Sequence, residues 1–217
     1  ETIRALGLEG KSAAQVGCNN ARELLSLASL KVIPSVGIDQ SGAFLEQGRV
    51  LAKAAGLEPR LIEADIYDLP DDVGTFDLVL VTIGVLNWMP DLGGFFRVIA
   101  GLLGPGGHLL VYETHPVMEM FDPESDTPHE PAISYFRTDP LKEEGLISYD
   151  GVDHGSGETG YWFIHTLGQI VTSCATAGMT ITSLKEFGYS IREPEYDVYE
   201  GREAQIPMSY LLHARKM

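Results

Sequence analysis

The stretch QVGCNNARELL, residues 15–25, lies between a short apolar run and a helix-like segment. In a parallel α/β sheet the first strand-to-helix loop is the usual ligand site, because backbone N–H groups at the start of the helix point toward an anionic group. Such loops are normally rich in glycine, whereas this one has a single glycine, Gly17, followed by CNNA. The stretch therefore predicts a cofactor loop built with unusual residues.

The spacing of small residues separates two kinds of cofactor loop. A dinucleotide loop needs small residues at its first, third and sixth positions, and the sixth position counted from Gly17 is the bulky Arg22. The other pattern uses the first, third and fifth positions, which are Gly17, Asn19 and Ala21. Asn enters the left-handed region more readily than other non-glycine residues, so Asn19 or Asn20 can replace a glycine. The second pattern is therefore favoured.

Outward from this loop, short apolar runs alternate with helix-like segments. Strands are predicted at 12–16, 34–39, 60–65, 76–84 and 108–114, and helices at 21–30, 42–56 and 91–103. Asp91 is expected to cap the last of these helices, and GPGG (104–107) to end it. In the helix at 42–56, Phe44, Leu51 and Ala55 are expected to share the apolar face. Strands that alternate with helices imply βαβ units and a parallel sheet.

The alternation breaks from 116 to about 160, and we interpret 116–160 as an insertion within one domain spanning 1–217. ISYFR (133–137) and LISYDG (146–151) are candidate strands of an inserted hairpin. After the insertion, Thr166 and Gln169 predict a capping box at the start of a helix. The runs at 179–187 and 207–215 have no helix between them, so we expect them to pair antiparallel.

The charge and residue composition argue against several kinds of partner. The formal charge of −16 argues against nucleic acid as a partner, because a phosphate backbone would be repelled. No apolar run reaches the roughly 18 residues that cross a bilayer, so no membrane association is expected. The presence of only two cysteines and the lack of a signal-peptide pattern favour a cytoplasmic protein. The six histidines show no metal-ligand spacing, so no metal is expected.

Four segments carry a resemblance to a known family. They are AAQVGCNNARELLSLA (13–28), VGIDQS (36–41), IEADIYDLP (62–70) and FDLVLVTIGVLNWMPDLGGFFRVIAGLLGPGGHLLVYETHP (76–116). In this order and spacing they resemble class I S-adenosylmethionine-dependent methyltransferases over about residues 10–115. The resemblance implies an α/β, Rossmann-like, mostly parallel seven-stranded sheet with helices on both faces and an antiparallel last strand. In this chain an inserted cap would lie between strand 5 and the last helix.

The resemblance also implies the cofactor S-adenosyl-L-methionine and its contacts. The loop at 17–21 would line the methionine portion, Asp39 would hold the ribose hydroxyls, Asp65 would meet the adenine, and 82–85 would border the sulfonium. The full set of implied contacts is Gly17, Cys18, Asn19, Ala21, Asp39, Gln40, Asp65, Ile66, Thr82, Gly84 and Val85. Within this set we interpret the Cys18 side chain as a buried filler rather than a nucleophile. Gln15 departs from the family, which usually has an acidic residue there to contact the ammonium group.

On the acceptor side, the resemblance implies that Asn87 and Trp88 face a small-molecule methyl acceptor. Trp162 is expected to join an aromatic pocket formed by the insertion, and His115 is the candidate catalytic base. Methyl transfer from a sulfonium is a direct displacement and needs no covalent nucleophile. Two alternatives stay open: a non-catalytic binding protein of the same fold, and a nicotinamide-dependent oxidoreductase, against which Arg22 counts. The chain is expected to be a monomer or a homodimer.

Overall fold

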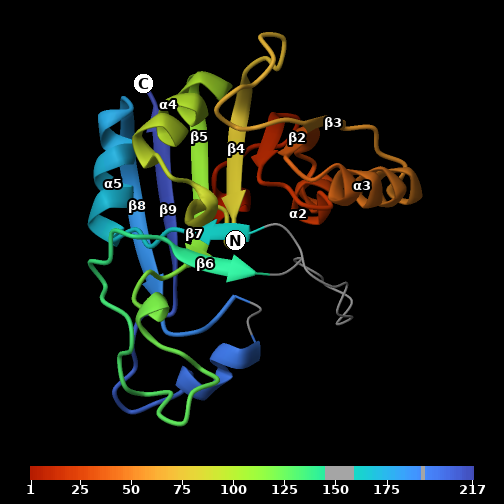
Figure 1. The fold of residues 1–217 in the computed structure, drawn as a ribbon. Coiled ribbons are helices and arrows are strands. Elements are labelled where there is room, and N and C mark those ends of the chain that lie inside the picture. The colour runs from red at the N-terminus through yellow and green to blue at the C-terminus, as the bar shows by residue number, and fades with distance from the viewer. Residues whose placement is uncertain (145–158, 192–193) are drawn as a thin grey trace.

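The computed structural model describes residues 1–144, 159–191 and 194–217. Its centre is a seven-stranded sheet with the strand order β3-β2-β1-β4-β5-β9-β8 (Figure 1). The strands are β1 Ser12–Val16, β2 Ile33–Asp39, β3 Arg60–Glu63, β4 Phe76–Thr82, β5 Leu103–Thr114, β8 Met179–Phe187 and β9 Ser209–Lys216. Strands β1 to β5 are parallel, and β9 is antiparallel to both β5 and β8. The predicted sheet, including its antiparallel last strand, is confirmed.

Helices cover both faces of the sheet, because side chains of the central strands alternate between two cores. The helices are α1 Thr2–Ala5, α2 Arg22–Ser26, η1 Leu27–Leu30, α3 Gly42–Ala55, η2 Leu86–Trp88, α4 Leu92–Leu102, η3 Met118–Met120, α5 Leu167–Thr176 and η4 Pro194–Tyr199. On β4, Val79 and Val81 pack with α4 and α5, whereas Leu78 and Leu80 pack with α2 and α3. This alternation follows from the two-residue period of a strand.

Local sequence signals set several helix boundaries. Asp91 caps α4 by accepting a hydrogen bond from the Gly94 N–H at 2.9 Å. Thr166 and Gln169 form the predicted capping box of α5. One expectation was wrong: GPGG does not separate α4 from a strand at 108, because β5 begins at Leu103 and runs through it. Phe76 pairs with Leu103 and Leu78 with His108, so GPGG bulges out of the β4–β5 ladder.

The buried face of α3 also differs from the expected one. Its buried residues are Leu45, Gly48 and Ala52, while Leu51 and Ala55 are exposed. Gly48 explains the difference: a Cβ there would lie 3.2 Å from the Asn20 carbonyl oxygen. The helix therefore presents its least bulky side to the loop at 17–21, because close approach of the two backbones excludes larger side chains.

The segment after β5 contains a hairpin made of other residues than those predicted. It joins β6 Leu141–Glu144 to β7 Thr159–Trp162 in antiparallel pairing. ISYFR (133–137) forms a turn instead of a strand, and the Tyr135 hydroxyl accepts a hydrogen bond from the Leu167 N–H at 2.9 Å. LISYDG (146–151) lies outside the described residues. Figure 1 shows the hairpin at the carboxyl end of β4.

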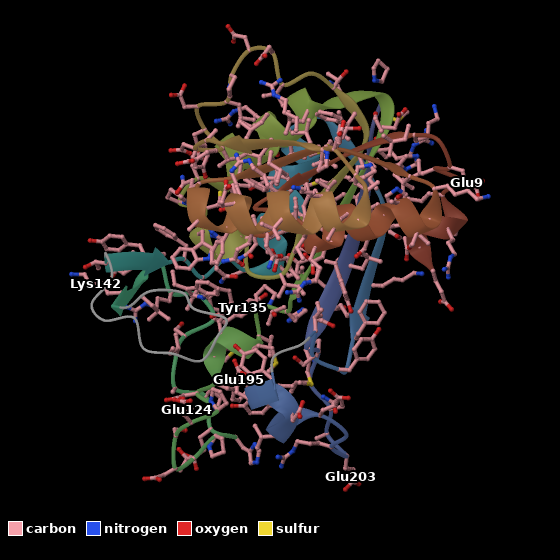
Figure 2. The ribbon with its side chains drawn as sticks, turned by 90° about the vertical axis from the view of Figure 1, so that its right-hand side faces the viewer. Glu9, Glu124, Tyr135, Lys142, Glu195 and Glu203 are labelled. Atoms are coloured by element: carbon pink, nitrogen blue, oxygen red, sulfur yellow. The ribbon has the colours of Figure 1, made fainter. Side chains whose placement is uncertain are left out.

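A second lobe lies beyond the same edge of the sheet. Residues 118–133 and 194–208 pack there around the buried side chains of Met118, Tyr199 and Met208. Figure 2 shows Glu124 and Glu195, one from each of these segments, in this lobe below the sheet. No helix in the described part of the chain is long and apolar enough to cross a bilayer.

Candidate functional site

The loop from β1 to α2 has left-handed residues at alternate positions. The φ angles are 61° at Gly17, 50° at Asn19 and 58° at Ala21, which are the first, third and fifth positions of the loop. Asn adopts this region with little penalty, whereas Ala pays about 1–2 kcal/mol. The Ala21 methyl group is completely buried, and its packing offsets part of that cost. The backbone thus follows the path of a glycine-rich loop although two of the three glycines are absent.

Asp39 joins the end of β2 to this loop. One carboxylate oxygen accepts a hydrogen bond from the Asn19 N–H at 2.7 Å, and the other accepts one from the Ser41 N–H at 2.9 Å. A carboxylate has about four acceptor positions, so the half-buried Asp39 retains capacity for hydroxyl donors. Gln40, the next residue, is exposed.

Gln15 lies beneath the loop and is only 1% exposed. Its amide oxygen accepts a hydrogen bond from the Leu24 N–H at 2.8 Å, and its amide nitrogen donates one to the Thr82 hydroxyl at 2.9 Å. The side chain therefore links β1, α2 and β4. Both ends of the amide have partners within the protein, at the position where the resemblance implies a carboxylate.

The Cys18 side chain points into the core below the loop. It is completely buried, and burial raises the pKa of its thiol far above the usual range. A Cβ added at Gly37 on β2 would lie 2.9 Å from its sulfur, which explains the glycine there. A thiol held in its protonated form is a poor nucleophile, which agrees with the interpretation of Cys18 as a filler.

The third segment of the site follows β4. Ile83 has a φ of 29°, which is an outlier for a β-branched residue, and Gly84 has a φ of 84°. This loop touches the loop at 17–21: a Cβ at Gly17 would lie 2.5 Å from a γ-carbon of Val85. Two loops from different strands are therefore in van der Waals contact at the carboxyl edge of the sheet.

Glu113 on β5 holds the loop after β4 in place. Its carboxylate accepts hydrogen bonds from the N–H groups of Gly84, Val85 (2.9 Å) and Leu86 (3.3 Å). The residue is 2% exposed, and burial raises the pKa of its carboxyl group to about 7 while the three N–H donors oppose the rise. The sequence analysis missed this residue, although a glutamate inside the apolar run HLLVYET was a usable signal.

Asp65 and Ile66 follow β3 at the same edge. One oxygen of the exposed Asp65 carboxylate accepts a hydrogen bond from the Tyr67 N–H at 2.9 Å, while the Ile66 side chain is buried. The Ala64 N–H donates to the Asp39 carbonyl at 3.1 Å, so the ends of β2 and β3 stay paired up to these residues. Carboxylates thus follow two neighbouring strands at the carboxyl edge of the sheet, and that of Asp39 contacts the loop at 17–21.

Asn87, Trp88 and Trp162 lie together on the side of the hairpin. The Trp162 indole N–H donates to Glu119 at 2.9 Å, and the Asn87 amide donates to the same carboxylate at 3.3 Å. The rings of Trp88 and Trp162 meet edge to face, with centroids 5.2 Å apart. A Cβ at Gly84 would lie 3.7 Å from the Trp162 ring, so this aromatic cluster borders the loop after β4. Glu119 lies in the irregular insertion, and no sequence pattern marked it.

His115 is buried and both of its ring nitrogens have partners. Nδ1 accepts a hydrogen bond from the Val117 N–H at 3.1 Å, so Nε2 carries the proton in the neutral ring and donates to Glu186 at 3.0 Å. Burial lowers the pKa of this histidine, and the neighbouring Glu186 carboxylate opposes the shift. Its role as a catalytic base stays a prediction, as do the ligand contacts assigned to the other residues.

Among residues 1–144, 159–191 and 194–217, no three His, Cys, Asp or Glu side chains converge as metal ligands. The described polar groups of the site make the hydrogen bonds to backbone and side-chain atoms given above. Their arrangement can hold a ligand with hydroxyl and amino groups across the ends of β1, β2 and β3. It can present that ligand to an aromatic surface at the end of β4.

Comparisons with known proteins agree with this arrangement. Residues 14–111 match the sequence model of a family described as methyltransferase domain. A demethylmenaquinone methyltransferase from Thermus thermophilus is 40% identical over 84 residues, which are 37% of this chain and 36% of that protein. One from Staphylococcus epidermidis is 31% identical over 117 residues, which are 52% of this chain and 47% of that protein. The chain thus spans less than half the length of these curated relatives.

The solved structures show the same fold. That of an S-adenosylmethionine-dependent methyltransferase from Mesorhizobium loti has a TM-score of 0.68 at 20% identity, covering 99% of this chain and 96% of that one. The sheet order, the left-handed loop and the family match agree with one another. Residues 14–111 thus match a methyltransferase family, and the chain has the fold of solved S-adenosylmethionine-dependent methyltransferases.

Proposed function

We propose that this chain transfers a methyl group from S-adenosyl-L-methionine to a small-molecule acceptor. The observation that carries the proposal is the left-handed geometry of Gly17, Asn19 and Ala21 beside the Asp39 carboxylate. In this proposal the loop at 17–21 lines the methionine portion of the cofactor, and Asp39 accepts hydrogen bonds from the ribose hydroxyls. Asp65 and Ile66 border the adenine. The bound cofactor supplies an electrophilic methyl group.

The protein's own contribution is to align the acceptor and to exclude water. Trp88 and Trp162 offer apolar ring surface beside Gly84, and Asn87 and Glu119 add polar groups at its margin. Such a surface suits a small molecule with a flat apolar part. The name of the two curated relatives, demethylmenaquinone methyltransferase, specifies a small-molecule acceptor and supports this class for the present chain.

The insertion at 116–160 is proposed as a cap on the acceptor side, within a single domain of residues 1–217. Its described parts include the β6–β7 hairpin and the segment that packs with residues 194–208 around Met118 and Tyr199. Residues 145–158 of this proposed cap lie outside the described part. A base at His115 would have to free Nδ1 from the Val117 N–H, or pass its Nε2 proton to Glu186, before it could accept a proton from an acceptor.

Calorimetric titration with S-adenosylmethionine and S-adenosylhomocysteine tests the cofactor assignment. Asp39→Asn keeps the size of the side chain but removes the charge that strengthens hydrogen bonds from hydroxyls. A hydrogen bond to a charged group contributes about 1.5–3 kcal/mol, so we expect affinity to fall by about 10- to 100-fold. Asp71→Asn, on the exposed loop before β4, makes the same change of charge and should leave the affinity unaltered. A folded wild-type protein that binds neither compound, or that binds only NADH, would refute the proposal.

A further inference from the structure

Glu113 is a buried carboxylate that the methyl-transfer proposal does not use. It is the last residue but one of β5, and its neighbour Tyr112 pairs with Thr82 at the end of β4. The Ile83 N–H still donates to the Tyr112 carbonyl at 3.0 Å, and the chain then leaves the β4–β5 ladder, so the N–H groups that follow need other acceptors. Those of Gly84, Val85 and Leu86 all turn to the two oxygens of Glu113. A charged acceptor forms stronger hydrogen bonds than a neutral one, so Glu113 is the main anchor of this turn.

The anchored loop has a conformation that needs support. Ile83 adopts a φ of 29°, and strained residues of this kind persist only where their surroundings hold them. The same loop presses Val85 against Gly17 and brings Gly84 under the Trp162 ring. A small displacement of residues 83–86 would therefore change both the cofactor loop and the aromatic surface.

We infer that Glu113 is a positioning residue, which holds residues 83–86 in the geometry required for cofactor binding and methyl transfer. This inference rests on the proposed function, because that function places the sulfonium beside the same loop. Glu113 is 2% exposed, and its carboxylate oxygens face the N–H groups of residues 84–86.

Ionisation of Glu113 gives the inference a measurable consequence. The carboxylate accepts all three N–H groups, whereas the neutral acid replaces one acceptor position with an O–H donor. The titratable groups near it are Glu119 on η3, Tyr210 on β9 and His165 before α5, and the His115 ring meets the Tyr210 ring edge to face. Glu119 repels the charge and favours the neutral acid. Burial raises the pKa of Glu113 to about 7 and lowers the pKa of both histidines below 6.5, so they titrate in a more acidic range.

The experiment measures binding of S-adenosylhomocysteine from pH 6 to pH 8 by the wild type and by Glu113→Gln. The wild type should bind about 10-fold more tightly at pH 8 than at pH 6, since one unit on each side of a pKa changes the ionised fraction by that factor. Glu113→Gln should bind weakly throughout, with a flat pH profile. Glu58→Gln, an exposed change of the same type, should retain the wild-type profile.

Thermal stability separates positioning from simple structural damage. A carboxyl group whose folded pKa is raised stabilises the fold fully below its unfolded value of about 4.5, and that contribution is lost as the pH rises through about 7. Glu113→Gln should therefore have a Tm equal to or above that of the wild type at pH 8, while binding more weakly. A purely structural residue would lower the Tm and the affinity together.

Each outcome has a distinct meaning. A wild type that fails to bind overturns the proposed function, and the inference with it. A wild type that binds, with an equal affinity and pH profile in Glu113→Gln, overturns the inference alone. If Glu113→Gln does not fold, Glu113→Asp decides, because it keeps the charge but shortens the reach: an unchanged affinity and pH midpoint in that variant overturns the inference.

Discussion

Replacing Gly17 by alanine tests the contact between the two loops of the site. The new methyl group would lie 2.5 Å and 3.1 Å from the two γ-carbons of Val85. Val85 is buried and β-branched, so it has few alternative rotamers into which it can move. Alanine would also have to keep the φ of 61° that Gly17 adopts.

The cost of this change has two parts that can be separated. The left-handed backbone costs about 1–2 kcal/mol for a residue with a Cβ. The overpacking against Val85 costs about 1–3 kcal/mol. We therefore expect Gly17→Ala to lower the free energy of unfolding by about 2–5 kcal/mol. Val85→Ala removes both clashing atoms and leaves a distance of 3.4 Å to its Cβ, which is ordinary contact.

A double-mutant cycle measured by urea unfolding isolates the steric part. Val85→Ala alone should cost about 2 kcal/mol for two buried methyl groups. The double variant should be more stable than the sum of the single changes predicts, by about 1–3 kcal/mol of coupling energy. The cost of the left-handed backbone in Gly17→Ala should be the same in the wild type and in the Val85→Ala variant. A coupling energy below about 0.5 kcal/mol, which is the usual error for independent sites, would refute the contact between the loops.

Two further substitutions test the interior of the site and its acceptor side. Gln15→Leu removes the acceptor of the Leu24 N–H and the donor to Thr82, and should destabilise the fold by about 1–3 kcal/mol, since a buried N–H is left unpaired. A loss below about 0.5 kcal/mol in urea unfolding would contradict this bridging role. Trp162→Phe keeps a ring beside Gly84 but loses the donor to Glu119, and should raise the KM of a methylated acceptor by about 10-fold without changing cofactor affinity. A change in cofactor affinity alone would contradict the assignment of Trp162 to the acceptor.

Local patterns in the sequence predicted the framework of this protein. The alternation of apolar runs with helical segments predicted the parallel sheet, because each βαβ unit is specified within about 30 residues. The antiparallel ending followed from two strand-like runs with no helix between them. Spacing identified Gly17, Asn19 and Ala21 as the small-residue positions of the loop, and the structure gives all three a positive φ. These features are local: they depend on side-chain periodicity, capping and backbone preference.

Contacts between distant segments were decided by tertiary structure. The face that α3 buries depends on the approach of Gly48 to the loop at 17–21, which no helical periodicity specifies. The partners of the β6–β7 hairpin depend on pairing across the segment between them, and β-propensity alone selected other residues.

The centre of the site also combines signals visible in the sequence with contacts between distant segments. Glu113 could be seen in the sequence as a glutamate in an apolar strand, yet its three N–H partners come from a loop 27–29 positions earlier. Trp162 meets Gly84, 78 positions away, only because the chain returns over the carboxyl edge of β4. The sequence by itself determined the strands of the central sheet, the main helices between them and the small-residue positions of the β1–α2 loop, whose signals are short in range. Only the tertiary structure decided which buried charge holds which loop, because burial and unpaired N–H groups arise when the sheet closes around them.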